Sequence, residues 1–96
     1  SDVYQIEQYS LSRDGILSNG QDQINLSPTE NKILAILFAH HNQVVSKEEL
    51  LEKLWENDSF IDQNTLSVNM ARLRKKISPL GFDRIHTVRG VGYLLK

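Results

Sequence analysis

The sequence DQNTLSVNMARLRKKIS, residues 62–78, decides how the rest of the chain must be arranged. Asp62 is a good helix cap, because its carboxylate can accept hydrogen bonds from the free backbone N–H groups of a first turn. Pro79 and Gly81 are typical of the end of a helix. Between these limits, apolar side chains recur at steps that place them on one face: Leu66, Met70, Leu73 and Ile77. The stretch therefore predicts an amphipathic helix packed against a core.

The opposite arc of this helix offers groups that can read duplex DNA. It carries Thr65, Val68, Asn69, Arg72, Lys75 and Lys76, with Arg74 at one flank. In a major groove, Arg72 would bond guanine, Asn69 would bond adenine and Val68 would touch a thymine methyl. Lys75 and Lys76 lie one turn further on, where phosphates are expected. A charge run is also typical of a face that is merely solvated, so the helix alone leaves both interpretations open.

The composition limits the classes of protein to which the chain can belong. The 96 residues, 40% hydrophobic and 24% charged, are typical of one small soluble domain. Cysteine is absent, which excludes disulfides and thiolate metal sites. No catalytic triad, carboxylate pair, phosphate loop or zinc-helix motif is present, so we expect no enzyme, metal or cofactor. No apolar run approaches a membrane span, and no signal peptide is visible.

Charge is distributed unevenly along the chain. The net charge is −1, which argues weakly against a nucleic-acid partner. Residues 1–61, however, hold 4 Lys+Arg and 10 Asp+Glu, whereas residues 62–96 hold 7 Lys+Arg and 2 Asp+Glu. Because the local field rather than the net charge steers an anionic partner, this split predicts one basic face.

The segments before the central helix read as a sheet and two helices. Alternating residues and turn dipeptides predict three or four strands of an antiparallel meander in residues 3–26, which we expect to be a scaffold. Ser27-Pro28-Thr29-Glu30 is a capping box that opens a deeply buried helix, fading near residues 40–42. Val44-Val45 is a brief strand, and Ser46-Lys47-Glu48-Glu49 is a second capping box.

Two aromatic residues frame the connection between the second and central helices. Trp55 is expected either in the core or at a rim where its indole N–H reaches a phosphate. The loop ENDSFI, residues 56–61, is acidic and should stay off DNA, with Phe60 anchored inside. The loop is either a simple connection or a protein-contact surface.

The C-terminal residues 85–95 predict a β-hairpin. Gly90 and Gly92 allow its turn to lie close to another backbone. Arg89 stands at the tip. An arginine on a hairpin beside a basic helix is how a wing reaches a minor groove or a phosphate.

Together these pieces resemble the winged-helix effector domain of OmpR/PhoB-type response regulators. The motifs that carry the resemblance are LSPTE at 26–30, VVSKEELL at 44–51 with Trp55, LRKKI at 73–77 and TVRGVGY at 87–93. The run NTLSVN at 64–69, with RGVGY at 89–93, also looks like the Gram-positive subgroup that answers antimicrobial peptides and cell-envelope stress (BceR/GraR/VirR-like).

The resemblance implies an α+β fold with an N-terminal four-stranded antiparallel sheet, three helices and a C-terminal wing, filling residues 1–96. It implies promoter binding in the bacterial cytoplasm, on direct repeats shared by two copies. It also implies a receiver domain before residue 1, phosphorylated by a sensor histidine kinase.

The same resemblance assigns roles to single residues. Base contacts are implied for Val68, Asn69 and Arg72, with Asn64 and Ser67 as further candidates. Phosphate contacts are implied for Trp55, Thr65, Arg74, Thr87 and Tyr93, and a minor-groove contact for Arg89. The acidic loop is implied to touch RNA polymerase through Glu56, Asn57, Asp58, Ser59 and Phe60. Some relatives carry arginine at position 64 and a polar residue at position 71, so the operator cannot be copied from them.

Two alternatives share the charge split. A protein-interaction module would dock its basic helix on an acidic partner and would not bind duplex DNA. An enzyme would require a constellation that the sequence lacks. If DNA is the partner, four to six phosphate contacts would give a log–log salt slope of about −4 to −5.

Overall fold

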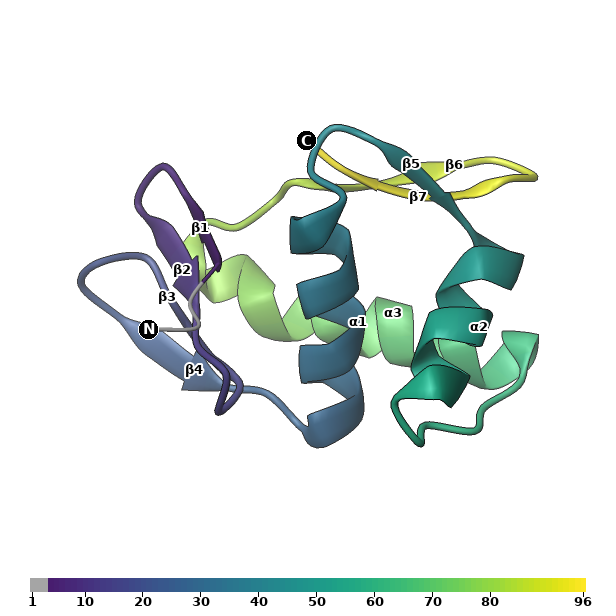
Figure 1. Ribbon diagram of the computed structural model, residues 1–96. Coiled ribbons are helices and arrows are strands. Elements are labelled where there is room, and N and C mark those ends of the chain that lie inside the picture. The colour runs from purple at the N-terminus through teal and green to yellow at the C-terminus, as the bar shows by residue number, and fades with distance from the viewer. Residues whose placement is uncertain (1–3) are drawn as a thin grey trace.

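The computed structural model describes residues 4–96 and places two antiparallel sheets around three helices in this part of the chain (Figure 1). The elements in order are β1 (Tyr4–Ile6), β2 (Tyr9–Leu11), β3 (Ile16–Ser18), β4 (Gln23–Asn25), α1 (Pro28–Ala39), β5 (Val44–Ser46), α2 (Lys47–Glu56), α3 (Gln63–Ile77), the 3-10 helix η1 (Ser78–Leu80), β6 (Ile85–Val88) and β7 (Gly92–Leu95). This architecture confirms the predicted α+β winged-helix fold.

The N-terminal sheet is the predicted four-stranded meander, in the order β1-β2-β3-β4. Its turns depend on Gly15 and Gly20, whose φ angles are 86° and 96°. These left-handed conformations are accessible to glycine without strain. The alternation of residues 3–7 predicts a first strand that is too long at one end, because Glu7 adopts a φ of 54° and belongs to the turn. Its other end, Val3, lies outside the described residues.

The first capping box forms completely, and the second forms in part. Ser27 Oγ accepts the Glu30 N–H at 3.2 Å, while Glu30 Oε1 accepts the Ser27 N–H at 2.8 Å. At α2, Ser46 Oγ accepts the Glu49 N–H at 3.0 Å. The Glu49 carboxylate does not complete that box, since it lies 3.9 Å from His40 Nε2. Both helices nevertheless begin where their serines predict.

The predicted terminal hairpin is part of a three-stranded sheet in the order β5-β7-β6. The strand at Val44-Val45 was predicted, but its pairing with β7 was not. Val45 lies opposite Tyr93 and Ser46 lies opposite Gly92. The wing is therefore fixed to the start of α2 as well as to its own partner strand.

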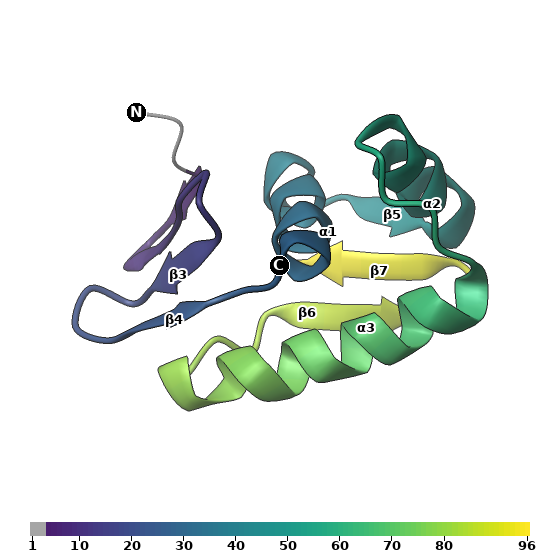
Figure 2. The same cartoon turned by 90° about the horizontal axis from the view of Figure 1, so that it is seen from below.

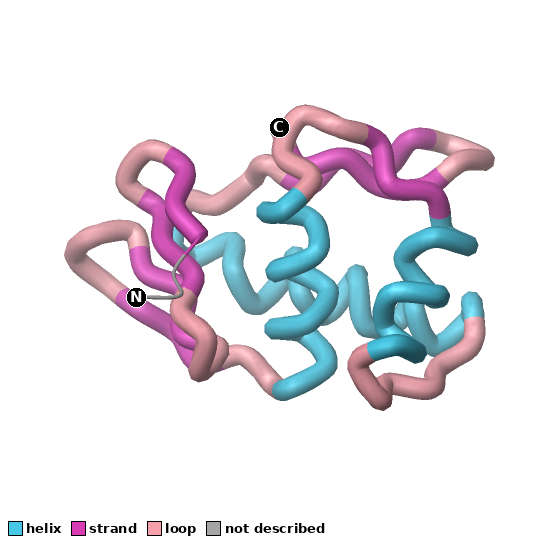
Figure 3. Tube along the Cα trace, in the orientation of Figure 1, coloured by secondary structure: helices cyan, strands magenta, loops and turns pink. Residues whose placement is uncertain are grey.

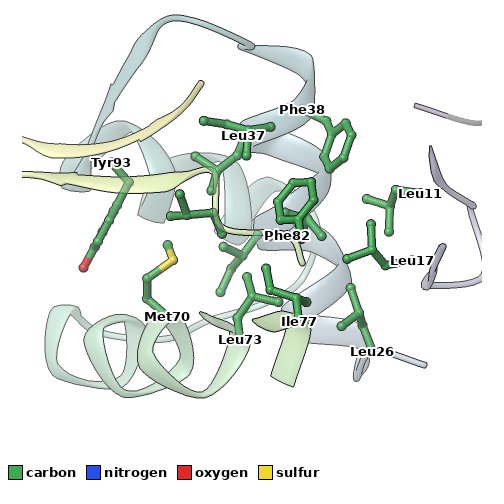
Figure 4. Close-up of a cluster of buried hydrophobic side chains, with 14 of the residues drawn as sticks. Leu11, Leu17, Leu26, Leu37, Phe38, Met70, Leu73, Ile77, Phe82 and Tyr93 are labelled. Carbon is green, nitrogen blue, oxygen red and sulfur yellow. The ribbon is translucent and has the colours of Figure 1, made fainter. Parts of the chain in front are cut away.

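A single core joins the helices to both sheets (Figure 4). The four residues of the α3 stripe are all buried, as the periodicity predicted: Leu66, Met70, Leu73 and Ile77. The same core contains Leu37 and Phe38 of α1, and Leu11 and Leu17 belong to it from the N-terminal sheet. The stripe thus commits one side of α3 to packing and leaves the other side outside.

The two sheets lie on different sides of the helices (Figure 3). Seen from below, α3 and β6 lie together along one side of the molecule, and the N-terminal sheet lies at the far end (Figure 2). The β6–β7 turn and the start of α3 lie at the same end of the molecule in both views. This arrangement places α3 and the wing on the same side of the molecule.

Candidate nucleic-acid interface

The outer arc of α3 carries exposed side chains of several chemical kinds. They include Asn64, Thr65, Ser67, Val68, Arg72 and Lys75. Val68 is apolar but 49% exposed. Hydroxyl, amide, methyl and guanidinium groups on one exposed helix face match the donors, acceptors and thymine methyls of base edges in a major groove.

Two of the predicted contact residues are partly engaged within the helix. Asn69 is half-buried, and its Nδ2 donates to the Thr65 carbonyl at 2.9 Å. Thr65 also caps the helix start, because its backbone N–H donates to Asp62 Oδ1 at 2.7 Å. This bond and one from the Thr65 hydroxyl lower the pKa of Asp62. The Asn69 amide therefore retains its oxygen and one hydrogen for an outside partner.

Lys76, for which the helical pattern predicts a phosphate contact, is exposed but has a partner within the protein. Its Nζ forms an ion pair with Glu30 Oε1 at 2.9 Å, at the start of α1. The reason is the angular position of Lys76 around the axis of α3. Lys76 is next to the buried Ile77, so its chain leaves α3 at the flank and extends toward α1. Burial alone would raise the pKa of Glu30, but the bonds from Lys76 and Ser27 outweigh that effect and lower it.

The lowered pKa gives Glu30→Gln a defined pH signature. At pH 7 we expect the free energy of unfolding to fall by about 1–2 kcal/mol, since a charge-assisted hydrogen bond is lost. A carboxylate whose pKa is lower in the folded protein stabilises it above the unfolded pKa, and this stabilisation disappears as the pH falls through the folded pKa. The two proteins should therefore converge in urea unfolding below pH 4.5, the ordinary value. A difference that grows toward acid would contradict the assignment.

Arg74 also makes contacts within the protein. Its Nη2 donates to the Ile85 carbonyl of β6 at 2.8 Å, and its guanidinium carbon lies 6.0 Å from the centre of the Tyr93 ring. The side chain is half-buried. Arg74 therefore links α3 to the base of the wing.

The wing presents one cation and buries its aromatic residue. Thr87 and Arg89 are exposed, as a DNA-contacting wing requires. Tyr93 is only 5% exposed, and its ring packs in the core (Figure 4). Gly90, with a φ of 77° and no atom within 4 Å of a built Cβ, forms the tip, while Gly92 packs against β5. The two predicted glycines are thus needed for different reasons.

The exposure of Trp55 decides between its two predicted positions in favour of the rim, and the prediction that Phe60 is anchored inside is wrong. Trp55 is 54% exposed and Phe60 is 72% exposed, so neither is a core residue. Leu50 and Leu54 fill the buried side of α2, which turns Trp55 outward. Its indole N–H donates to the Ile61 carbonyl at 3.1 Å, so a phosphate would have to compete with this bond.

The loop after α2 is held against α1 by Lys32, a residue that the sequence analysis did not identify. Lys32 of α1 donates to the Asn57 carbonyl at 2.6 Å and to Ser59 Oγ at 3.0 Å. Ser59 is buried, whereas Phe60, the next residue, is exposed. The rest of the predicted polymerase-contact set, Glu56, Asn57 and Asp58, is exposed. A lysine on a polar helix face gives no local sign of so distant a partner.

Several cations of the basic C-terminal part of the chain therefore have partners within the protein. Arg84 pairs with Glu7 and donates to the Lys96 carbonyl, in addition to the contacts of Arg74 and Lys76. Among residues 4–96, the cations of α3 and the wing without a hydrogen-bond or ion-pair partner are Arg72, Lys75 and Arg89.

Two further features are absent from residues 4–96. None of their helices has the length and hydropathy needed to span a membrane. Their His, Asp and Glu side chains form no group of three or more that could hold a metal ion.

Known proteins are similar to this chain in both sequence and structure. Residues 20–95 match the family described as "Transcriptional regulatory protein, C terminal". The response regulator protein GraR of Staphylococcus aureus (strain Mu50 / ATCC 700699) is 46% identical over 85 residues, which cover 88% of this chain and 38% of GraR. The chain thus spans well under half the length of the curated relatives it matches.

Two solved structures extend the comparison. The C-terminal domain of the nisin resistance regulator NsrR, a lantibiotic response regulator, superposes with a TM-score of 0.92 at 70% identity, covering 96% of this chain and 95% of that one. The DNA-binding domain of Klebsiella pneumoniae RstA, solved with the RstA box, superposes with a TM-score of 0.79 at 25% identity, covering 99% and 97%. The resemblance found in the sequence motifs is confirmed, and the chain belongs to the family of C-terminal domains of transcriptional regulatory proteins.

Proposed function

We propose that this domain, residues 1–96, binds double-stranded DNA sequence-specifically at promoters, as the effector domain of a two-component response regulator. The observation that carries the proposal is the shared face of α3 and the wing, with Arg72 and Lys75 exposed on the helix and Arg89 at the wing tip. α3 would enter the major groove. The wing would lie on the flanking minor groove or backbone, and the domain would perform no catalysis itself.

The relatives support the finer parts of the proposal. NsrR is a lantibiotic response regulator, which supports a role in the response to antimicrobial peptides or cell-envelope stress. RstA was solved with its DNA box, which supports duplex DNA as the partner. We further propose the cytoplasmic arrangement implied for the family: a phosphorylated receiver domain, a sensor histidine kinase, and two copies on a direct repeat.

Glu56, Asn57, Asp58, Ser59 and Phe60, in the acidic loop after α2, form the proposed contact with RNA polymerase. Trp55 and Phe60 expose their rings there, 6.5 Å apart between centroids. Exposed aromatic side chains of this size favour a protein contact. Glu56 and Asp58 keep the loop electrostatically unsuited to phosphates.

Arg89→Ala should weaken binding to every duplex by a similar factor. Arg89 is exposed at a hairpin tip and would contact backbone or minor groove rather than a specific major-groove edge. We expect the log–log salt slope to become shallower by about 1. Fluorescence anisotropy at several salt concentrations measures this slope, and an unchanged slope would remove Arg89 from the interface.

A selection experiment tests the function itself. The domain is titrated into a pool of randomised duplexes at two salt concentrations, and the bound DNA is recovered and sequenced. The proposal predicts salt-sensitive binding that enriches a short direct repeat. Absence of binding at low salt, also for a covalently linked tandem of two domains, would instead favour docking of α3 on an acidic protein.

A further inference from the structure

The basic run Arg72-Leu73-Arg74-Lys75-Lys76 contains two kinds of cation. Arg72 and Lys75 are exposed and have no hydrogen-bond or ion-pair partner among residues 4–96. Arg74 is bonded to the Ile85 carbonyl at 2.8 Å, and Lys76 is paired with Glu30 at 2.9 Å. The sequence gives all four the same positive charge, whereas the fold separates them in pairs.

The two bonded cations hold α3 on opposite sides. Consecutive residues of an α-helix are about 100° apart, so positions 74 and 76 are separated by about 200° around the axis. Arg74 reaches the wing through β6 and the Tyr93 ring. Lys76 reaches the start of α1 through Glu30, which is 6% exposed and is itself held by the Ser27 N–H.

These contacts can fix the orientation of α3 in a way that the apolar stripe does not. Burial of apolar side chains is non-directional and tolerates small rotations of a helix on its core. Hydrogen bonds weaken steeply when their geometry is lost. Two directional contacts on opposite flanks therefore define both the rotation of α3 and its position relative to the wing.

We propose that Arg74 and Lys76 are positioning residues, and that Arg72 and Lys75 supply the DNA contacts of this run. Arg74 sets the wing against the recognition helix, and Lys76 sets the helix against α1. This inference rests on the proposed function. It reverses the phosphate roles that the family resemblance implies for Arg74 and that the helical pattern predicted for Lys76.

The separation of the cations into bonded and unbonded pairs changes the salt slope expected for the domain without substitutions. Counting only unpaired cations leaves Arg72, Lys75 and Arg89 on the face. Each phosphate neutralised by such a cation contributes about 0.9 to the salt slope. One domain should then show a slope of about −2 to −3, shallower than the −4 to −5 expected from the sequence.

Glutamine variants, each of which removes one positive charge, test on DNA whether Arg74 and Lys76 differ from Lys75. Lys75→Gln should make the slope shallower by about 0.9. Arg74→Gln and Lys76→Gln should leave the slope unchanged and weaken binding severalfold at every salt concentration. Arg74→Lys is a second variant in case the first folds poorly. It keeps the charge but not the planar fork, so we expect it to bind as weakly as Arg74→Gln. A slope change equal to that of Lys75→Gln would overturn the inference.

The two possible roles of Lys76 predict opposite effects of Glu30→Gln on DNA affinity. If Lys76 is a positioning residue, loss of its partner should weaken DNA binding by the fully folded protein. If Lys76 contacts a phosphate, removal of a nearby anion and release of the lysine should strengthen binding. Tighter binding by Glu30→Gln would therefore overturn the role of Lys76.

A measurement without DNA keeps the inference separate from the proposed function. The chain has no cysteine, so spin labels attach only at introduced Ser67→Cys and Val91→Cys, on α3 and in the wing turn. We expect a narrow distance distribution in the parent and in Lys75→Gln, and a broader one in Arg74→Gln. Equal widths would overturn the role of Arg74. Failure of the parent to bind any duplex would instead refute the proposed function.

Discussion

Gly92→Ala should lower the free energy of unfolding by about 3 kcal/mol, at the upper end of the usual cost of overpacking. A Cβ at this position would overlap the Val45 carbonyl oxygen and lie 2.7 Å from Ser46 Cα. Both obstacles are backbone atoms of β5, which cannot rotate away as a side chain would. The change would separate β5 from β7 and loosen the wing. Urea unfolding measures the loss directly.

Gly90→Ala is the matched control for that change. Gly90 has a φ of 77°, but nothing lies within 4 Å of a built Cβ. Its substitution should cost only the strain of a left-handed backbone, about 1 kcal/mol. If both variants were equally stable, β5 and β7 would not approach each other as closely as the structure shows.

Arg72→Ala should abolish discrimination at one base pair of the operator, at a cost of about 1–3 kcal/mol for the preferred sequence. Arg72 is exposed on the outer arc and is free of the internal contacts that hold Arg74 and Lys76. A guanidinium in the major groove pairs with the O6 and N7 acceptors of guanine. Competition anisotropy with duplexes substituted at each position identifies the base that loses its preference.

Lys75→Ala serves as the comparison for Arg72→Ala. Both are exposed cations of α3, but Lys75 is expected at phosphates and carries no base preference. It should weaken binding to all duplexes alike. If Arg72→Ala also weakened specific and random duplexes equally, Arg72 would be a phosphate contact and the base readout would lie elsewhere on α3.

The sequence predicted those features that depend on neighbours along the chain. The α3 stripe follows from periodicity alone, and all four of its residues are buried. Ser27, Ser46 and Asp62 each cap the helix that their position predicts, because a cap bonds to an N–H only a few residues away. The turn glycines were recognisable for the same reason.

Features that depend on distant partners were not predictable in this way. Lys76 and Glu30 are 46 positions apart, and Arg74 reaches a backbone carbonyl, which leaves no side-chain signature. Periodicity places a residue on one side of a helix but does not say what another element brings there. The prediction that Phe60 is anchored inside was wrong for a related reason, since the bond between Lys32 and the buried Ser59 decides how the loop lies on α1.

The most direct test of the central claim is a ¹H–¹⁵N NMR titration of the domain with the selected duplex. Amide shifts should concentrate at Asn64, Ser67, Val68 and Arg72 on α3 and at Arg89 in the wing turn. The N-terminal sheet, β1 to β4, should move little, because it lies at the far end of the molecule from the wing tip. Shifts confined to that sheet or to the loop after α2, with α3 and the wing unperturbed, would contradict the account.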